Sequence, residues 1–184
     1  MSAMRLFSNF RRLGMAPGRL VLLAALAVSA ALAAMPATAQ TLPAGVRLGM
    51  SADELRSVLP EVERVARPQR LAGGLAGNWR AAPVSLAGLP FDLTFFFTGG
   101  QLQRVEYVTA AQAESDRAAG AFSQLLAWGR TTFGPEVGAR DPGSAYASWV
   151  AGDIDVYLQH TDGARGASVR LVYKTRQLKD GSAL

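Results

Sequence analysis

The fold is decided by one stretch of the chain, residues 91–108, which reads FDLTFFFTGGQLQRVEYV. Two runs rich in aromatic and β-branched residues flank a Gly-Gly pair, a pattern typical of a β-hairpin. A three-residue loop with Gly100 in the left-handed region pairs Leu93 with Val105, so that apolar side chains share one face. A two-residue loop would instead place Leu93 opposite Glu106 and mix apolar with charged partners. We therefore expect a hairpin with the three-residue loop.

A short helix is expected upstream of this hairpin. Ser51 and Glu54 have the spacing of a capping box, in which each side chain accepts a hydrogen bond from the backbone N–H of the other residue. Apolar residues then recur with helical spacing up to Leu59, and Pro60 ends the pattern. A helix of two to three turns is not stable alone, so we expect a sheet to hold it.

A longer helix and three strands are expected downstream. The helix lies within residues 111–133, because apolar side chains form one stripe there and Gly134-Pro135 follows. Apolar and polar residues alternate along each of the three later runs, which is typical of strands with one buried face. The expected strands are Tyr146–Ala151, Ile154–His160 and Ala167–Lys174.

Short sequence matches recur in the same order in the two halves of the chain. Pro60-Glu61-Val62 follows the first expected helix, and Pro135-Glu136-Val137 follows the second. We therefore predict an α+β fold with two tandem helix-plus-three-strand units, at about residues 46–108 and 112–174. The units would form antiparallel sheet with the helices packed on one face, in a single domain over residues 40–184.

The first 39 residues have the pattern of a secretory signal peptide. The apolar run Leu20–Ala34 is shorter than the roughly 20 residues that span a bilayer, and Ala37-Thr38-Ala39 follows it. Small residues suit a signal peptidase, so we expect cleavage after Ala39. Because the Ala- and Arg-rich usage indicates a bacterial chain, we expect export to the periplasm. Alternative starts of translation are Met1, Met4 and Met15.

Charge and cysteine content exclude several classes of function. Four of the 19 basic residues lie in the expected leader, which holds no acidic residue, so the rest of the chain carries 15 basic against 14 acidic groups. A nearly neutral domain lacks the basic surface on which nonspecific nucleic-acid binding depends, and we expect no nucleic-acid partner. The chain has no cysteine, which excludes disulfides, thiolate metal ligands and a lipid anchor on a cysteine after the leader.

The run Val46–Leu55, VRLGMSADEL, resembles the opening motif of the SmpA/OmlA (BamE-like) family of outer-membrane assembly lipoproteins. Leu93-Thr94-Phe95, with Gly100 and Leu102, is similar to the terminal strand pair of that family. The doubled unit resembles the tandem architecture of β-lactamase-inhibitor-like proteins. These resemblances imply a small envelope protein that acts by protein contact, without chemistry. No cysteine follows the leader here, so the lipid anchor of the first family is not expected.

The residues best suited to chemistry lie around His160, the only histidine. Asp155 and His160 are an odd number of positions apart, so on one strand their side chains point to opposite faces. Asp153 and Asp162 are typical turn residues. We therefore expect no catalytic residue, no metal ligand and no cofactor.

Exposed aromatic side chains are the strongest candidates for partner binding. In the expected register Phe96 and Leu102 lie with Arg104 on the outer face of the hairpin, and Tyr157 lies on the outer face of its strand. Aromatic and arginine side chains commonly anchor interfaces. We therefore expect an exported, non-enzymatic protein-interaction module of the cell envelope, which binds an envelope protein through Phe96, Leu102, Arg104 and Tyr157.

Two alternatives stay open at the level of sequence. If Phe96 and Leu102 are exposed, Phe96→Ser leaves the fold intact, whereas a loop or the second unit covering them would make both core residues. For function, the alternative is a small-ligand carrier or a hydrolase with a pocket between helix and sheet. In that case His160→Ala is expected to abolish activity or ligand binding.

Overall fold

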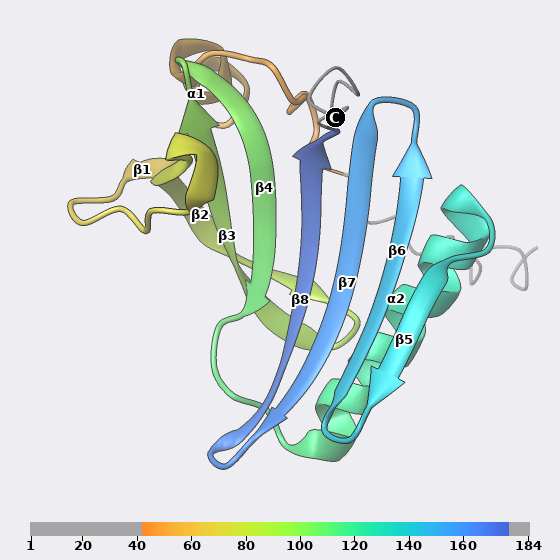
Figure 1. The fold of residues 1–184 in the computed structure, drawn as a ribbon. Coiled ribbons are helices and arrows are strands. Elements are labelled where there is room, and N and C mark those ends of the chain that lie inside the picture. The colour runs from red at the N-terminus through yellow and green to blue at the C-terminus, as the bar shows by residue number, and fades with distance from the viewer. Residues whose placement is uncertain (1–41, 177–184) are drawn as a thin grey trace, which may run out of the picture. The chain divides into compact units, whose positions relative to one another are not determined.

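Two α-helices and eight strands form the fold in the computed structural model, which describes residues 42–176 (Figure 1). The expected signal peptide, residues 1–39, and its cleavage after Ala39 lie outside the described residues. No helix in the described part is both long and apolar enough to cross a membrane. In chain order the elements are α1 (Ala52–Val58), β1 (Glu63–Arg64), the 3-10 helix η1 (Ala72–Gly74), β2 (Ala76–Leu86), β3 (Leu89–Thr98), β4 (Gln101–Thr109), α2 (Ser115–Phe133), β5 (Val137–Asp141), β6 (Ser144–Ala151), β7 (Ile154–Gly163) and β8 (Gly166–Thr175).

All eight strands belong to one sheet in which every pair is antiparallel, in the order β1-β2-β3-β4-β8-β7-β6-β5. The strands that follow α1 therefore meet those that follow α2 where β4 pairs with β8. Val105 lies opposite Tyr173 at this junction, and Tyr107 lies opposite Leu171. All four side chains are buried, so the core runs across the junction without interruption.

The predicted pair of tandem helix-plus-three-strand units is wrong, although helices and antiparallel strands are both present. The sheet is continuous, and four strands follow each α-helix. The edge strand β5 reads VGARD and lacks the alternation that identifies a strand, yet it pairs with β6 along its whole length. Pairing β4 with β8 also removes two exposed strand edges, which separate units would leave unpaired.

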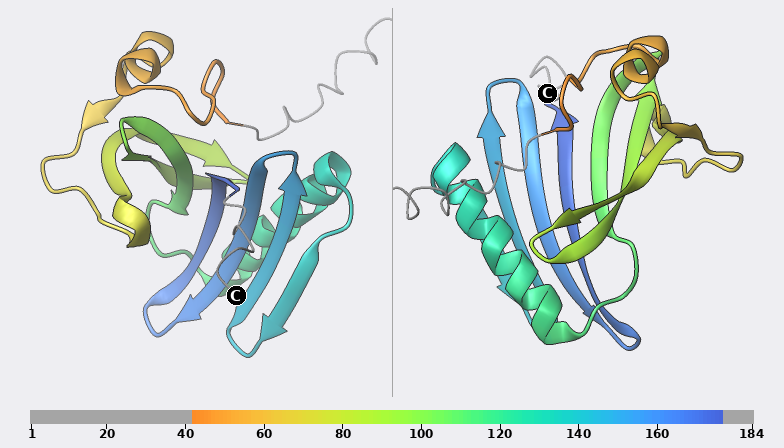
Figure 2. Two further views of the ribbon diagram at one scale, coloured as in Figure 1. Left: turned by 45° about the horizontal axis from the view of Figure 1, so that its top comes forward. Right: turned by 180° about the vertical axis from the view of Figure 1, so that it is seen from behind.

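Helix α1 begins where the sequence predicts. Ser51 Oγ accepts from the Glu54 N–H at 3.2 Å, and the Glu54 carboxylate accepts from the Ser51 N–H at 2.7 Å. Leu55, the one buried residue of α1, joins the core. Figures 1 and 2 show α1 at one end of β3 and β4, while α2 lies across a face of the sheet. The two helices therefore do not share one face as predicted.

The hairpin of β3 and β4 has the predicted strands but a different register. Thr98 pairs with Gln101, and both glycines between them have positive φ, so the turn has two residues. A bulge follows at Gln103, because Phe96 pairs with Arg104. It shifts β4 by one residue and pairs Leu93 with Tyr107 rather than with Val105. The bulge lets a two-residue turn coexist with an apolar face.

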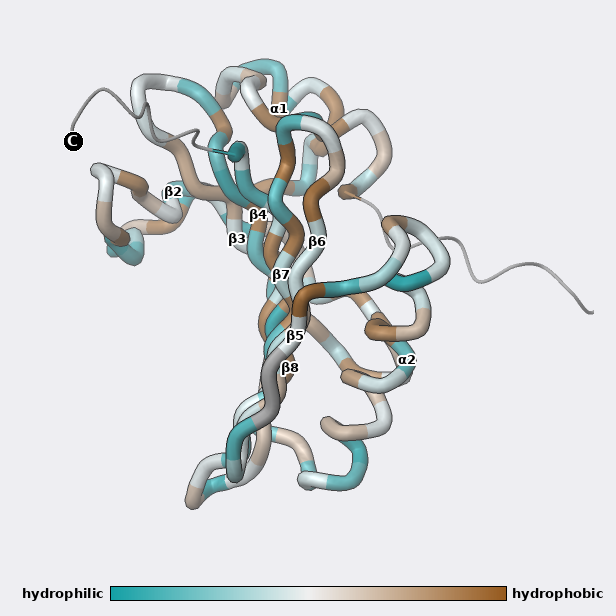
Figure 3. Tube along the Cα trace, turned by 45° about the vertical axis from the view of Figure 1, so that its right-hand side comes forward, coloured by the Kyte–Doolittle hydropathy of each residue, from teal (hydrophilic) through white to brown (hydrophobic). Residues whose placement is uncertain are grey.

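Helix α2 covers one side of strands β6, β7 and β8. Phe122 and Leu125 of α2 are buried in the same core as Leu158 and Leu171 of the sheet. Because side chains alternate along a strand, every second residue of these strands points away from α2. Figure 3 views this part of the sheet nearly edge-on and shows α2 on one side and no helix on the other.

Candidate binding face

We call the surface of β4, β8, β7, β6 and β5 on the side opposite α2 the open face (Figures 2 and 3). Tyr146 and Val150 of β6 point to it, because Trp149 between them is buried on the α2 side. Val137 of β5 lies opposite Ser148 in the same face. Three of the four exposed large hydrophobic residues in the described part, Val137, Tyr146 and Val150, thus lie on the open face. Grouped exposed apolar side chains mark interaction surfaces.

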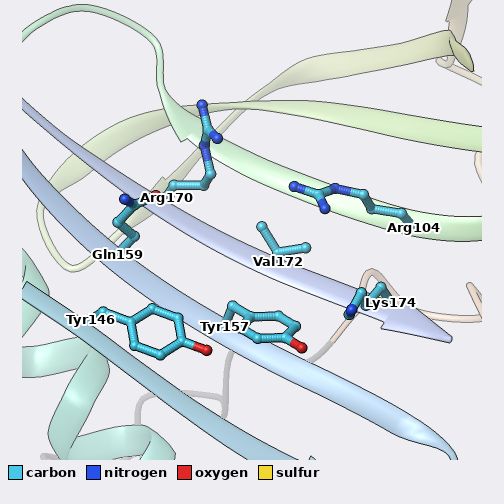
Figure 4. Close-up of a pocket in the computed structure, with 7 residues that line it drawn as sticks. All are labelled: Arg104, Tyr146, Tyr157, Gln159, Arg170, Val172 and Lys174. Carbon is cyan, nitrogen blue, oxygen red and sulfur yellow. The ribbon is translucent and has the colours of Figure 1, made fainter. Parts of the chain in front are cut away.

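A hollow of about 330 Å³ lies on the open face beside this apolar group. Figure 4 shows Val172 of β8 in the middle of the hollow, with Arg104 and Arg170 along one side and Tyr146 and Tyr157 along the other. The hollow therefore has a basic side over β4 and β8 and an aromatic side over β6 and β7. Its lining residues are Arg104, Tyr146, Tyr157, Gln159, Arg170, Val172 and Lys174.

The basic side is organised around a buried carboxylate. Glu106 is 4% exposed, and its Oε2 lies 3.1 Å from Arg104 Nη2 while its Oε1 lies 2.9 Å from Arg170 Nε. Register explains the arrangement, since β4 pairs with β8 so that Arg104 faces Lys174 and Glu106 faces Val172. One carboxylate thus holds two guanidinium groups in place, and the charge of the group remains positive.

The aromatic side is a pair of stacked tyrosines with a lysine against it. The rings of Tyr146 and Tyr157 have centroids 5.9 Å apart and planes 30° apart. Lys174 Nζ lies 4.9 Å from the Tyr157 centroid, a cation–π contact, and 3.6 Å from Asp155 Oδ2. The Tyr157 hydroxyl donates to the same carboxylate at 3.3 Å. These contacts hold the Tyr157 ring in a defined position on the open face.

The four predicted binding residues divide into two pairs. Arg104 and Tyr157 both line the hollow. Phe96 and Leu102 are fully buried, so the prediction that they are exposed anchors is wrong. The bulge turns Leu102 to the core side, where its N–H donates to the Met50 carbonyl, and the backbone of Gly77 lies against the Phe96 ring.

Sequence reasoning missed Tyr146, Arg170 and Lys174. The alternation of β8 places Arg170, Val172 and Lys174 on one face, and this signal was readable in the sequence. Their meeting with Arg104 was not readable, because it depends on the pairing of β4 with β8, whose partners are 62 to 70 residues apart in the chain. Arg104 comes from the hairpin of β3 and β4, whereas the other lining residues come from β6, β7 and β8, and only the folded sheet brings the two groups together.

His160 lies on the opposite side of the sheet, against α2. Its side chain is 8% exposed, and its ring centroid is 6.0 Å from that of Phe122. Asp155 points to the open face, as the sequence predicts for these two residues. Asp162 lies in β7 rather than in a turn, with Oδ1 3.6 Å from His160 Nε2. Residues 42–176 contain no group of three or more His, Cys, Asp or Glu side chains placed to hold a metal ion.

A second hollow, of about 370 Å³, lies between α2 and the β5–β6 edge. Arg130 of α2 donates to the Glu136 carboxylate there through Nη2 and, at 2.8 Å, through Nε. These hydrogen bonds lower the pKa of Glu136 to about 2, from an ordinary value of 4.5. This ion pair ties the end of α2 to the start of β5. His160 is not among the residues that line this hollow.

Comparisons of the chain with models of known protein families, with curated proteins and with solved structures find no match. The resemblance of residues 46–55 to the SmpA/OmlA family stays a prediction.

Proposed function

We propose that the protein is an exported, non-enzymatic protein-interaction module of the cell envelope that binds a partner through its open face. The observation that carries the proposal is the meeting of exposed apolar side chains with a tyrosine and arginine hollow on the one face that α2 leaves uncovered. Tyrosine and arginine, like tryptophan, are enriched among the side chains that dominate the free energy of binding at protein interfaces.

The dimensions of the open face favour a macromolecular partner over a small molecule. Five neighbouring strands contribute to it, which corresponds to a width of roughly 20 Å at about 4.8 Å per strand spacing. The exposed valines Val137 and Val150 extend the surface beyond the hollow, since neither lines it. A small molecule held in the hollow would leave these apolar side chains in water.

Export is supported by the sequence alone. The apolar run Leu20–Ala34 and the following Ala37-Thr38-Ala39 have the order of a secretory signal. A partner in the envelope follows from this location.

Photocrosslinking in cells tests the proposal. The complete reading frame would be expressed with a photoreactive amino acid replacing Val150 on the open face, or Gln124, an exposed residue of α2, as the control. We expect a discrete crosslinked protein with the label at position 150 and none at position 124. The crosslinked product should be found in the envelope fraction, and within it the N-terminal residue of this chain should be Gln40. Equal crosslinking at both positions, or none at position 150, would contradict the proposal.

A further inference from the structure

We propose that the open face binds an extended acidic segment of the partner protein, with a carboxylate of that segment seated above Val172 between the basic and aromatic sides of the hollow. This inference rests on the proposed function and states the chemistry that the partner presents.

The first observation is an excess of positive charge around the hollow. Its lining residues include three cations and no acidic side chain. At its margin Glu106 is shared by Arg104 and Arg170, and Asp155 is shared by Lys174 at 3.6 Å and Arg176 at 4.0 Å. Four cations thus meet two carboxylates, and this cluster keeps two positive charges in excess. The rest of the chain beyond the expected leader is nearly neutral, so this excess is a local property.

The second observation is that the arginines keep hydrogen-bond donors accessible from the open face. A guanidinium group has five N–H donors, and the ion pair between Arg170 and Glu106 is made through Nε. The Arg170 side chain is 46% exposed, which leaves its outer edge accessible from the open face. Because Glu106 already orients both arginines, an incoming carboxylate meets donors that are held in place.

The third observation is the shape of the surface, which favours an extended segment over a compact ligand. A further hollow of about 450 Å³ adjoins the first and shares Arg104 and Lys174 with it. Its far side is formed by the segment around η1, including Leu71 and Leu75. The cations therefore stand in the middle of a track that runs from the tyrosines to the η1 segment. A peptide in extended conformation fits such a track, with its carboxylate at the centre and apolar side chains on either side.

Retention of synthetic peptides tests this inference. One pool contains peptides of about nine residues, roughly 30 Å when extended, in which a central Asp or Glu has Val, Leu, Tyr or Phe two and four positions away on either side, so that all these side chains point to one face. A matched pool carries Asn or Gln in place of every acid. We expect the immobilised protein, produced from the full reading frame, to retain the acidic pool about tenfold more strongly, with the preference falling as NaCl rises from about 0.05 to 0.5 M.

Gln159 offers a variant that removes none of the residues in the observed ion pairs. It lies directly opposite Arg170 and lines the hollow. Gln159→Glu places a competing carboxylate beside Arg170, so we expect it to abolish the preference for the acidic pool. Gln159→Lys should keep or increase the preference. Arg165→Gln, which removes an exposed charge in the turn between β7 and β8, is the control and should change nothing. Melting temperatures of all variants confirm that they fold.

The outcomes separate the two proposals. If both pools are retained equally, or if Gln159→Glu does not change the retention of the acidic pool, the proposal of an acidic segment is overturned. Crosslinking at position 150 would in that case still support the protein-interaction function. Failure of both experiments overturns both proposals. Stronger retention of a single-stranded oligonucleotide than of the acidic pool also overturns the inference, in favour of nucleic acid. If sedimentation velocity shows a dimer and Gln159→Glu dissociates it, the inference is also overturned, because the open face then binds a second copy of the chain.

Discussion

Phe96 shows how a residue on the open side of a strand becomes part of the core. It lies opposite Arg104, yet its side chain is fully buried. A Cβ atom on Gly77 would lie 3.0 Å from Phe96 Cε1 and 2.9 Å from Thr94 Cγ2, so only glycine lets the backbone of β2 approach the ring this closely. The Arg104 guanidinium carbon is 5.8 Å from the ring centroid. Phe96 therefore supports Arg104, a residue of the proposed binding surface, without itself being exposed.

Substitution of Phe96 tests this assignment. We expect Phe96→Ser to lower the free energy of unfolding by about 3–5 kcal/mol, because it leaves a cavity and buries a hydroxyl. Val150→Ser, on an exposed residue of the same face, should change it by less than about 0.5 kcal/mol. Urea unfolding measures both variants. A Phe96→Ser protein as stable as wild type would show that the ring is not a core residue.

One close approach sets the distance between α2 and β6. A Cβ on Gly129 would lie 2.4 Å from Trp149 Cζ2, so the indole ring packs directly on the helix backbone. The ring has little freedom to move, because its Nε1 donates to the Gly134 carbonyl at 3.0 Å. That carbonyl belongs to the residue that ends α2, whose φ is +90°. The same tryptophan therefore fixes the helix end and its distance from β6.

Two glycines of α2 give a matched test at the level of this element. Gly129→Ala should destabilise the protein by about 1–3 kcal/mol, because overpacking against Trp149 outweighs the roughly 1 kcal/mol gained in helix propensity. Gly120→Ala should stabilise it by up to about 1 kcal/mol, since nothing lies within 4 Å of the added Cβ. Thermal unfolding followed by circular dichroism gives both values. If the two variants shift in the same direction, the close approach is not the limiting contact.

At the scale of the molecule, one continuous sheet separates a packed side from an open side. Helix α2 packs over β6, β7 and β8, but β5 extends past this helix contact at the edge of the sheet. The ion pair between Arg130 and Glu136 spans the short connection from α2 to β5. It stabilises the position of the edge strand whose Val137 extends the open face. Packing on one side thus holds the surface presented on the other.

This ion pair makes the stability of the molecule depend on pH. The folded pKa of Glu136, about 2, lies below its ordinary value of 4.5, so the ionised carboxylate stabilises the folded state. That contribution is complete above pH 4.5 and is lost as the pH falls towards 2. We expect Glu136→Gln to lower stability at neutral pH and to flatten this part of the pH profile, measured by urea unfolding. Arg130→Gln should have the same effect, and the double variant should add little. An unchanged profile in Glu136→Gln would contradict this role.

Local elements were determined by the sequence itself. The capping box at Ser51 begins α1, Gly134 ends α2, and alternation locates the last two strands to within three residues at each end. These features depend on neighbours a few positions away, so short-range backbone geometry and side-chain periodicity are sufficient to predict them. The same periodicity correctly placed Tyr157 and His160 on opposite sides of the sheet.

Only the tertiary structure decided which elements meet. The pairing of β4 with β8 joins distant parts of the chain into one sheet and brings Arg104 beside Lys174. A one-residue bulge in β4 and the approach of Gly77 decided that Leu102 and Phe96 are buried. Alternation along a strand tells which side chains share a face, but it carries no information about the neighbouring strand or about what covers that face. The open face is therefore a product of strand pairing that no local pattern in the sequence contains.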